Sequence, residues 1–236
     1  MHMARSYEQF CPMAAALDAI GARWALLVVR ELMLGPRSFT QLTEALAGIG
    51  TDILTARLRS LEHAGVVHRI GEGRRRDYAL TDEGRALQAV LSELARWGAA
   101  RLAPLRNPNE VSTRTALTAL LLDARPIPTG LEGTYEIKSG QDVALVSVRG
   151  TKLMLDSANE AEADSTVASM LLTRAGLFAL ILGTKARSLL EGGKLEIHGQ
   201  KRKAIALIDA LAAPELIEPM AVRMGAAGLE PPTPRV

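Results

Sequence analysis

The sequence lacks the residues that disulfides, metal clusters and membrane-spanning helices require. Cys11 is the only cysteine among 236 residues, so no disulfide can form within one chain, and the four histidines are too scattered for a structural zinc set. No run approaches the roughly 20 apolar residues that a membrane-spanning helix needs, and MHMARSYEQF lacks the apolar core of a secretory signal. We therefore expect a cytoplasmic protein with no membrane partner, no metal and no cofactor.

Catalytic signatures are missing as well. The sequence shows no nucleophile with an adjacent base, no glycine loop that could cradle a phosphate and no paired carboxylates. The glycines of GEG, at Gly71 and Gly73, are too short a signal for a nucleotide site. The sequence therefore predicts a protein that is not an enzyme.

The chain also has little net charge, +2 overall, but the excess is local. Residues 1–105 hold 13 arginines and no lysine against 11 acidic residues, whereas the remainder is balanced at 15 of each sign. Arginine keeps its charge and forks onto phosphate oxygens or guanine edges. A nucleic-acid surface in the first part of the chain is consistent with this distribution.

Helical spacing followed by a short β pattern fills the first hundred residues. AAALDAIGARWALLVVREL indicates two short helices broken near Gly21, and FTQLTEAL follows a GPRS turn as a third. In TDILTARLRSLEHAG, Leu54, Leu58 and Leu61 recur at i, i+4 and i+7 and face inward. Gly65 ends that helix, and two β runs, VVHRI and DYALT, flank a tip of three arginines. The second short helix is expected to bury a stripe of Trp24, Leu27, Val28 and Leu32.

This order of helix, short helix, turn, second helix and β-hairpin is that of a winged helix-turn-helix, whose second helix enters the DNA major groove. The hairpin tip becomes the wing and contacts phosphates or the neighbouring minor groove. Three arginines at a hairpin tip can also be only a solvated loop, but the preceding helix pair favours DNA contact. The predicted DNA-binding residues are Arg37, Thr51, Asp52, Thr55, Ala56, Arg59, Arg74, Arg75 and Arg76.

The same region resembles the HxlR-type winged helix-turn-helix regulators of bacteria. The resemblance spans roughly residues 10–103 and rests on CP, LDAIGARWALLVVREL, GPRSFTQL, IGTDILTARLRSLEHAGVV and YALTDEG, in that order. It implies a dimeric DNA-binding repressor or activator. Ser38 departs from it, because a second basic residue is common there, and the wing is short, with arginines where prolines often occur.

Some regulators of this type sense oxidants through a cysteine at the place that Cys11 occupies. A single cysteine among apolar neighbours is otherwise a small buried hydrophobe, and no Lys, Arg or His stands beside Cys11 in the sequence to activate its thiol. Both interpretations stay open at the level of sequence.

TDEGRALQAVLSELARWGAARL predicts one long helix that Thr81 caps, with Asp82 and Glu83 at its positive end. Its apolar stripe, too large for a small winged domain to cover, consists of Leu87, Val90, Leu91, Leu94 and Trp97. The stripe either packs on a second domain of the same chain or forms the two-fold seam of a homodimer, which the resemblance favours. A dimer would hold its recognition helices about 34 Å apart and bind a pseudo-palindromic operator.

Beyond LAPLRNPNE the pattern changes, which predicts two domains, 1–107 and 108–236. STRTALTALLL is helical, and GTYEIKSG, VALVSVRG and TKLMLDS indicate an antiparallel meander. ASMLLTRAGLFALIL and TKARSLLEGG are expected to be helices, KLEIHG a strand, KRKAIALIDAL a last helix and EPPTPRV a loose tail. The first domain is thus mainly α, and the second is α+β with an antiparallel sheet.

Roughly residues 115–212 resemble the sterol-carrier-like domain of type-two sterol carrier proteins, which holds apolar molecules between sheet and helices. The resemblance rests on GTYEI and on the segment from Glu162 to Leu211. The apolar run there either fills a dry core or lines a pocket, whose predicted lining is Leu171, Leu172, Leu177, Phe178, Ile181 and Leu182. Lys201 to Lys203 either attract an anionic ligand head or are simply solvated.

The leading interpretation is a homodimeric regulator that binds duplex DNA and senses an apolar small molecule through its second domain. The rival is a carrier of apolar ligands in which the winged domain serves only for dimerisation or protein contact.

Overall fold

The computed structural model describes residues 6–71, 77–99, 101, 112–122, 126–156 and 166–212. The chain divides into two compact units, Met1–Gln88 and Ala89–Val236, and each is described by itself. This division groups the helix after Gln88 with the second unit, whereas the sequence places the boundary at residue 107, inside 102–111 and outside the described residues.

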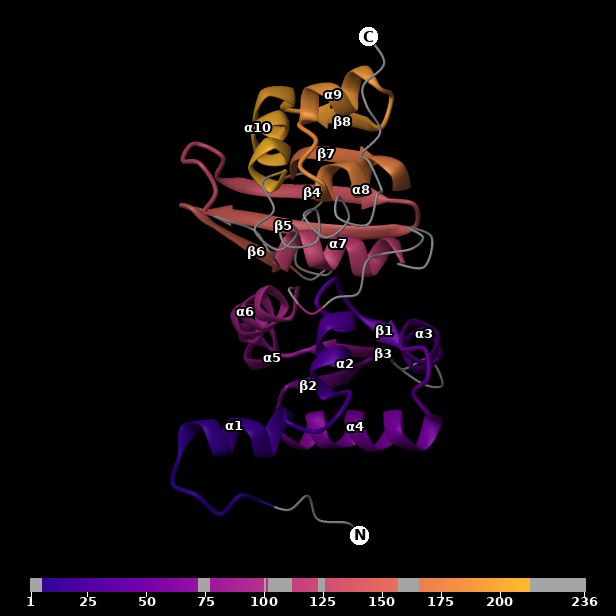
Figure 1. Ribbon diagram of the computed structural model, residues 1–236, viewed down its shortest axis with the longest axis vertical. Coiled ribbons are helices and arrows are strands. Elements are labelled where there is room, and N and C mark those ends of the chain that lie inside the picture. The colour runs from indigo at the N-terminus through magenta and orange to yellow at the C-terminus, as the bar shows by residue number, and fades with distance from the viewer. Residues whose placement is uncertain are drawn as a thin grey trace. The chain divides into compact units, whose positions relative to one another are not determined.

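The first unit is a small helical domain with a three-stranded sheet (Figure 1). Its elements in chain order are α1 (Pro12–Ile20), α2 (Ala25–Leu32), β1 (Arg37–Ser38), α3 (Phe39–Ala45), α4 (Thr51–His63), β2 (Val67–Ile70), β3 (Asp77–Leu80) and α5 (Asp82–Ala86).

The predicted break between the first two helices is confirmed at Gly21. A Cβ at Gly21 would lie 2.5 Å from the carbonyl oxygen of Leu17, so a larger residue does not fit there. Trp24 then takes a left-handed conformation at the start of α2. The predicted buried stripe is half right, because Val28 and Leu32 are buried but Leu27 is exposed. The buried side of α2 turns instead through Ala25, Val28, Val29 and Leu32.

Ser38 stands where HxlR-type sequences often have a basic residue, and the structure gives it a role as the N-cap of α3. Its Oγ accepts a hydrogen bond from the backbone N–H of Gln41, and its own N–H donates to Gln41 Oε1 at 2.9 Å. This reciprocal capping box satisfies two backbone donors that the helix start would otherwise leave open. A basic residue at position 38 could not make it.

The helix α4 is fixed by its leucines, as the sequence predicts. Leu54, Leu58 and Leu61 are fully buried, and each contributes roughly 1.5–3 kcal/mol by leaving water. Gly65 ends the helix in a left-handed conformation, with φ +72°, that favours glycine.

The small sheet has the order β1-β3-β2 and is antiparallel throughout. β1 was not predicted, since a two-residue strand carries no periodicity, and it pairs Arg37 with Tyr78. Thr81 joins the end of α4 to α5: its Oγ1 donates to the carbonyl oxygen of Gly65 at 2.6 Å and accepts from the N–H of Gly84.

The helix predicted to run on from Thr81 is wrong as a single element. Thr81 does cap it, but α5 ends at Ala86, and α6 (Gln88–Ala99) begins after Leu87. Gly84 sits against the carbonyl oxygen of Val66 with no room for a side chain, so α5 packs tightly where the hairpin begins.

The second unit is a five-stranded sheet with helices packed against it (Figure 1). After α6 its elements are α7 (Thr113–Leu122), β4 (Gly133–Ser139), β5 (Asp142–Arg149), β6 (Lys152–Asp156), β7 (Thr166–Leu172), α8 (Arg174–Ile181), α9 (Ala186–Glu191), β8 (Leu195–Gly199) and α10 (Lys201–Leu211).

The predicted antiparallel meander is confirmed for β4, β5 and β6, but the sheet as a whole is mixed and not antiparallel. The strand order is β6-β5-β4-β7-β8, and β4 and β7 run parallel at the centre. β7 pairs with the edge of β4 that the meander leaves free, and it runs in the same direction as β4.

The apolar run from Met170 to Leu182 is not the single helix that its composition suggested. It is split at Thr173, whose hydroxyl accepts from the N–H of Gly176 and caps α8. Before the cap, Ala168, Met170 and Leu172 alternate inward as a strand does. A Ser/Thr cap signal was therefore present in the sequence inside the apolar run.

One face of the five-stranded sheet carries the core. Tyr135, Ile137, Val146 and Met170 on this face are fully buried, and α7, α8 and α10 contact the strands that bear them. Tyr135 donates its hydroxyl to the carbonyl oxygen of Leu131, and burial, with the nearby Glu132 carboxylate, raises the pKa of Tyr135.

The opposite face is partly exposed and mixes polar with apolar side chains, among them Val143, Met154 and Leu171. Burial alone would raise the pKa of Glu136, but hydrogen bonds from Lys138 and Ser169, both 2.7 Å, and the lysine charge outweigh it and hold that pKa below its ordinary value. The second unit is thus two layers deep, with the apolar interior between the sheet and its helices.

Among the described residues no single helix is both long and apolar enough to cross a bilayer, although α1 and α2, bent by 75°, pass that test as a pair by length and composition alone.

Candidate nucleic-acid interface

The outward side of α4 gathers most of the predicted DNA-binding residues. Thr51, Asp52, Ala56 and Arg59 are exposed, and Thr55 is half-buried on the same side. Because the leucines hold the opposite side in the core, α4 presents these residues on a fixed surface. Small side chains around one arginine leave room for base edges to approach.

Ile53 is a surface residue that sequence reasoning missed. It lies beside Leu54 in an apolar pair, and only the fold shows that its side chain is 45% exposed on the outward part of α4. An apolar side chain in this position can contact the methyl group of thymine.

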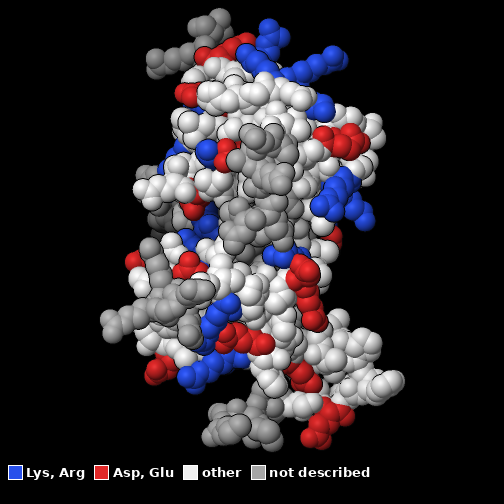
Figure 2. Space-filling model, turned by 180° about the vertical axis from the view of Figure 1, so that it is seen from behind, with Lys and Arg blue, Asp and Glu red and all other residues white. Residues whose placement is uncertain are grey.

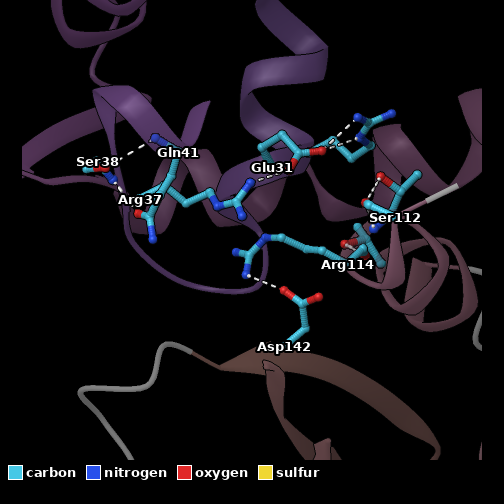
Figure 3. A network of polar contacts seen from close by, with 10 residues as sticks. Glu31, Arg37, Ser38, Gln41, Ser112, Arg114 and Asp142 are labelled. Carbon is cyan, nitrogen blue, oxygen red and sulfur yellow. Dashed lines mark hydrogen bonds and ion pairs between the residues drawn. The ribbon is translucent and has the colours of Figure 1, made fainter. Parts of the chain in front are cut away.

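Arg37 lies on β1 and is held by a buried carboxylate (Figure 3). Its Nη1 is 2.9 Å from Glu31 Oε2, while Arg30 donates through Nη2 to the other oxygen at 2.7 Å. The Glu31 side chain is only 2% exposed, so two cations compensate the one buried charge. The guanidinium that the sequence assigned to DNA therefore has a partner within the protein.

The hairpin of β2 and β3 follows α4 directly. His68 and Arg69 are exposed on β2, and Arg69 forms a two-bond ion pair with Glu62 near the end of α4. This hydrogen bond, then the neighbouring Tyr78 and the Glu62 charge, raise the pKa of Arg69 despite some burial. Arg74, Arg75 and Arg76, the predicted wing contacts, lie outside the described residues.

On the face drawn in Figure 2, the coloured Lys and Arg side chains alternate with Asp and Glu. Neither sign of charge dominates the described residues on this face.

Cys11 is half-buried and precedes α1, where it occupies the cap position without a side-chain capping hydrogen bond. Its redox role stays a prediction. In the described part of the chain, no group of three or more His, Cys, Asp or Glu residues could hold a metal ion.

The six predicted ligand-lining residues do not share one surface. Leu172, Leu177 and Ile181 are buried, and Phe178 is half-buried under the guanidinium of Arg174, 5.6 Å from its ring centre. Leu171 and Leu182 are exposed, and Leu171 points to the other face of the sheet because side chains alternate along β7. These two residues lie outside the buried core, and the ligand-lining role of all six residues stays a prediction.

A short helix followed by a second helix with an outward polar side, and then a β-hairpin, defines a winged helix-turn-helix protein. The HxlR-like helix-turn-helix family matches residues 19–105. YvaP of Bacillus subtilis, an uncharacterised HTH-type transcriptional regulator, is 37% identical over 94 residues, which are 38% of this chain and 87% of YvaP. The chain belongs to the HxlR family of helix-turn-helix transcriptional regulators, and the family resemblance seen in the sequence is confirmed.

Two further relatives match the same part of the chain. The uncharacterised HTH-type regulator sll1512 of Synechocystis is 40% identical over 91 residues, 37% of this chain and 67% of sll1512. The solved reduced form of the transcriptional regulator YodB from B. subtilis is 35% identical, with 38% of this chain and 92% of that chain covered and a TM-score of 0.35. As a member of this family, the protein has DNA as its implied partner.

Proposed function

We propose that the protein is a homodimeric transcriptional regulator that reads a pseudo-palindromic operator with α4 and responds to an apolar molecule held in its second unit. The observation that carries the DNA part is the outward side of α4, with Arg59 and Ala56 exposed on a helix whose other side is buried in the core. In a winged helix-turn-helix this helix enters the major groove. A duplex partner implies action where the chromosome lies, in a bacterium the cytoplasm.

Arg59 is the residue to which we assign base reading. It is exposed in the middle of α4, and an arginine fork can bond the O6 and N7 atoms of guanine. Arg74 to Arg76 would contact phosphates, which adds affinity for every sequence and little preference. Glu31 already engages Arg37, so we assign Arg37 to the support of this surface.

The homodimer is supported by an apolar stripe on α6. Val90, Leu94 and Trp97 recur at i, i+4 and i+7 and are 47%, 45% and 61% exposed. Such a stripe on one helix is costly to leave in water and suits a second copy of the same helix across a two-fold axis.

The apolar-ligand part rests on the two-layer architecture of the second unit. Leu172, Leu177 and Ile181 lie between the sheet and the helices, where a sterol-carrier-like domain would hold an acyl chain. The rival function, an apolar-ligand carrier without DNA binding, uses the same interior and differs only in the role of α4.

The experiment that separates these functions is fluorescence anisotropy with a labelled duplex from the promoter of the protein's own gene, titrated at several salt concentrations. We expect wild-type protein to bind this duplex more tightly than an unrelated one, and Arg59→Ala to lose roughly tenfold of that preference, within the 1–3 kcal/mol that one bidentate base contact provides. Arg187→Ala, which removes an arginine that is 88% exposed on α9, is the matched control and should change neither value. Wild-type protein that binds both duplexes equally would favour the carrier.

A combined Arg74, Arg75 and Arg76 to Ala variant is expected to bind all duplexes more weakly. Its affinity should also depend less on salt, by a slope of about 0.9 for each phosphate that the variant no longer neutralises. An unchanged slope would remove the wing from the interface.

A further inference from the structure

Three side chains connect the recognition helix to the hairpin that follows it. Arg69, in the middle of β2, places Nε 2.7 Å from Oε1 and Nη2 3.2 Å from Oε2 of Glu62, so both carboxylate oxygens are engaged. Its guanidinium carbon also lies 5.3 Å from the ring centre of Tyr78, the residue paired with it on β3. We call Glu62, Arg69 and Tyr78 the Arg69 cluster.

The contacts of this cluster fix the orientation of the Arg69 guanidinium as well as its distance from Glu62. A two-bond ion pair holds the planar guanidinium in one orientation, and the face of Tyr78 restricts it further. The Arg69 and Glu62 side chains are 40% and 25% exposed, so solvent screens the pair and its contribution to stability is small. Its consequence is therefore geometric: the last turn of α4 and both strands of the hairpin are held at one angle.

That angle matters for a surface made of two parts. If α4 enters the major groove and the hairpin meets the neighbouring backbone, both must reach one duplex at the same time. A surface that already has the bound arrangement loses less conformational entropy when it binds. A residue that holds the two parts together then adds affinity without touching DNA.

We propose that Arg69 is a positioning residue for DNA binding, which holds α4 and the β2–β3 hairpin in the arrangement that a duplex requires. This role rests on the proposed DNA-binding function. It assigns the Arg69 guanidinium to Glu62 and Tyr78 in the complex as well as in the free protein. The alternative is that Arg69 releases Glu62 and contacts a phosphate directly.

The variant Glu62→Gln separates the two roles because they predict opposite signs. It keeps the shape of the side chain and the charge of Arg69, and it removes one negative charge next to the DNA surface. A positioning role predicts that affinity for the promoter duplex falls by about three- to tenfold, because the arrangement loosens. Direct phosphate contact predicts equal or tighter binding, because Arg69 is released and a repulsive charge is removed.

Glu44→Gln is the matched control, since Glu44 is an exposed carboxylate on α3 and its change removes the same charge. Its affinity should stay equal to that of wild type or rise slightly. Arg69→Lys supplies a second test: lysine keeps the charge but cannot form the two-bond pair, so a positioning role predicts a fall similar to that of Glu62→Gln. A variant that combines Glu62→Gln with Arg69→Lys should bind DNA no more weakly than the more affected of the two single variants, because both changes break the same interaction.

Anisotropy titrations of these variants at several salt concentrations, with melting temperatures of each, decide the question. The proposal is supported if Glu62→Gln and Arg69→Lys bind more weakly while their melting temperatures stay near that of wild type. Glu62→Gln that binds as tightly as Glu44→Gln overturns the positioning role and leaves the DNA-binding function standing. Wild-type protein that binds no duplex overturns both.

Discussion

Glu31 is a carboxylate buried in the first unit that two arginines of different elements compensate. Arg30 stands beside it on α2, and Arg37 reaches it from β1, so the carboxylate joins the helix to the small sheet. A buried ion pair is a weak source of net stability, but the loss of one partner leaves an uncompensated charge that costs several kcal/mol.

We therefore expect Glu31→Ala to lower the free energy of unfolding of the first unit by about 3 kcal/mol or more. Urea denaturation followed by circular dichroism measures this loss. Glu44→Ala, an exposed carboxylate of the same unit, should stay within about 0.5 kcal/mol of wild type and serves as the control. If both variants lost the same free energy of unfolding, the buried ion pairs of Glu31 would contribute nothing to stability.

Single residues also show which site assignments a sequence can support. Arg59 and Arg37 look alike as basic residues before or within a helix, and the sequence assigned both to DNA. The structure distinguishes them, because Arg59 is exposed on α4 whereas Arg37 donates to Glu31. Partners that are distant in sequence, or that lie in an unpredicted strand such as β1, leave no local pattern.

At the scale of elements, α4 and α6 are both amphipathic, but their apolar sides differ in what covers them. The leucines of α4 are buried within the first unit. The helix α6 packs in the second unit, where the hydroxyl of Ser92 donates a hydrogen bond to the carbonyl oxygen of Leu122 on α7. Leu91 of α6 is buried, yet Leu94 and Trp97 remain exposed. This exposed stripe is where we expect the second copy to bind.

The variant Leu94→Glu should convert the proposed homodimer to a monomer, because a carboxylate would enter an apolar seam without a partner. Size-exclusion chromatography with light scattering gives the mass directly. Ala89→Glu adds the same charge to an exposed position of α6 away from the stripe and should remain dimeric. If Leu94→Glu and wild type have the same mass, the seam lies elsewhere or the protein is not a dimer.

Elements differ in how well periodicity predicts them. The buried leucines of α4 and the end of the helix at Gly65 were predicted correctly. Both depend on local signals, the helical spacing of apolar residues and a glycine after the last turn. The run from Met170 to Leu182 was misassigned because a buried strand and a buried helix are both simply apolar, and only Thr173 marks the boundary. The parallel pairing of β4 and β7 has no local signal at all.

At the scale of the whole molecule, the proposed apolar ligand can control DNA binding only if its affinity differs between two states of the protein, one that binds DNA and one that does not. A tenfold change in operator affinity requires about 1.4 kcal/mol of such difference. Binding free energies are reciprocal, so the duplex must change the affinity for the ligand by the same factor.

We expect native mass spectrometry of the purified protein to show a bound acyl compound, and delipidated protein to bind a long-chain fatty acid. The fatty acid should then change the affinity for the promoter duplex about tenfold, and the duplex should change fatty-acid affinity equally. Fatty acid that binds without any effect on the duplex would contradict the coupling. Failure to bind would contradict the sterol-carrier-like interpretation of the second unit.

The sequence by itself determined the winged helix-turn-helix and the family, because these depend on periodicity, caps and turn glycines, which act over a few neighbouring residues. The tertiary structure decided which side chains are available. It showed that Glu31 holds Arg37, that Arg69 holds Glu62, that Leu171 faces away from Leu172, and that β4 and β7 run parallel. These outcomes depend on which distant segments pack together, and that packing energy is not encoded in any single stretch of the chain.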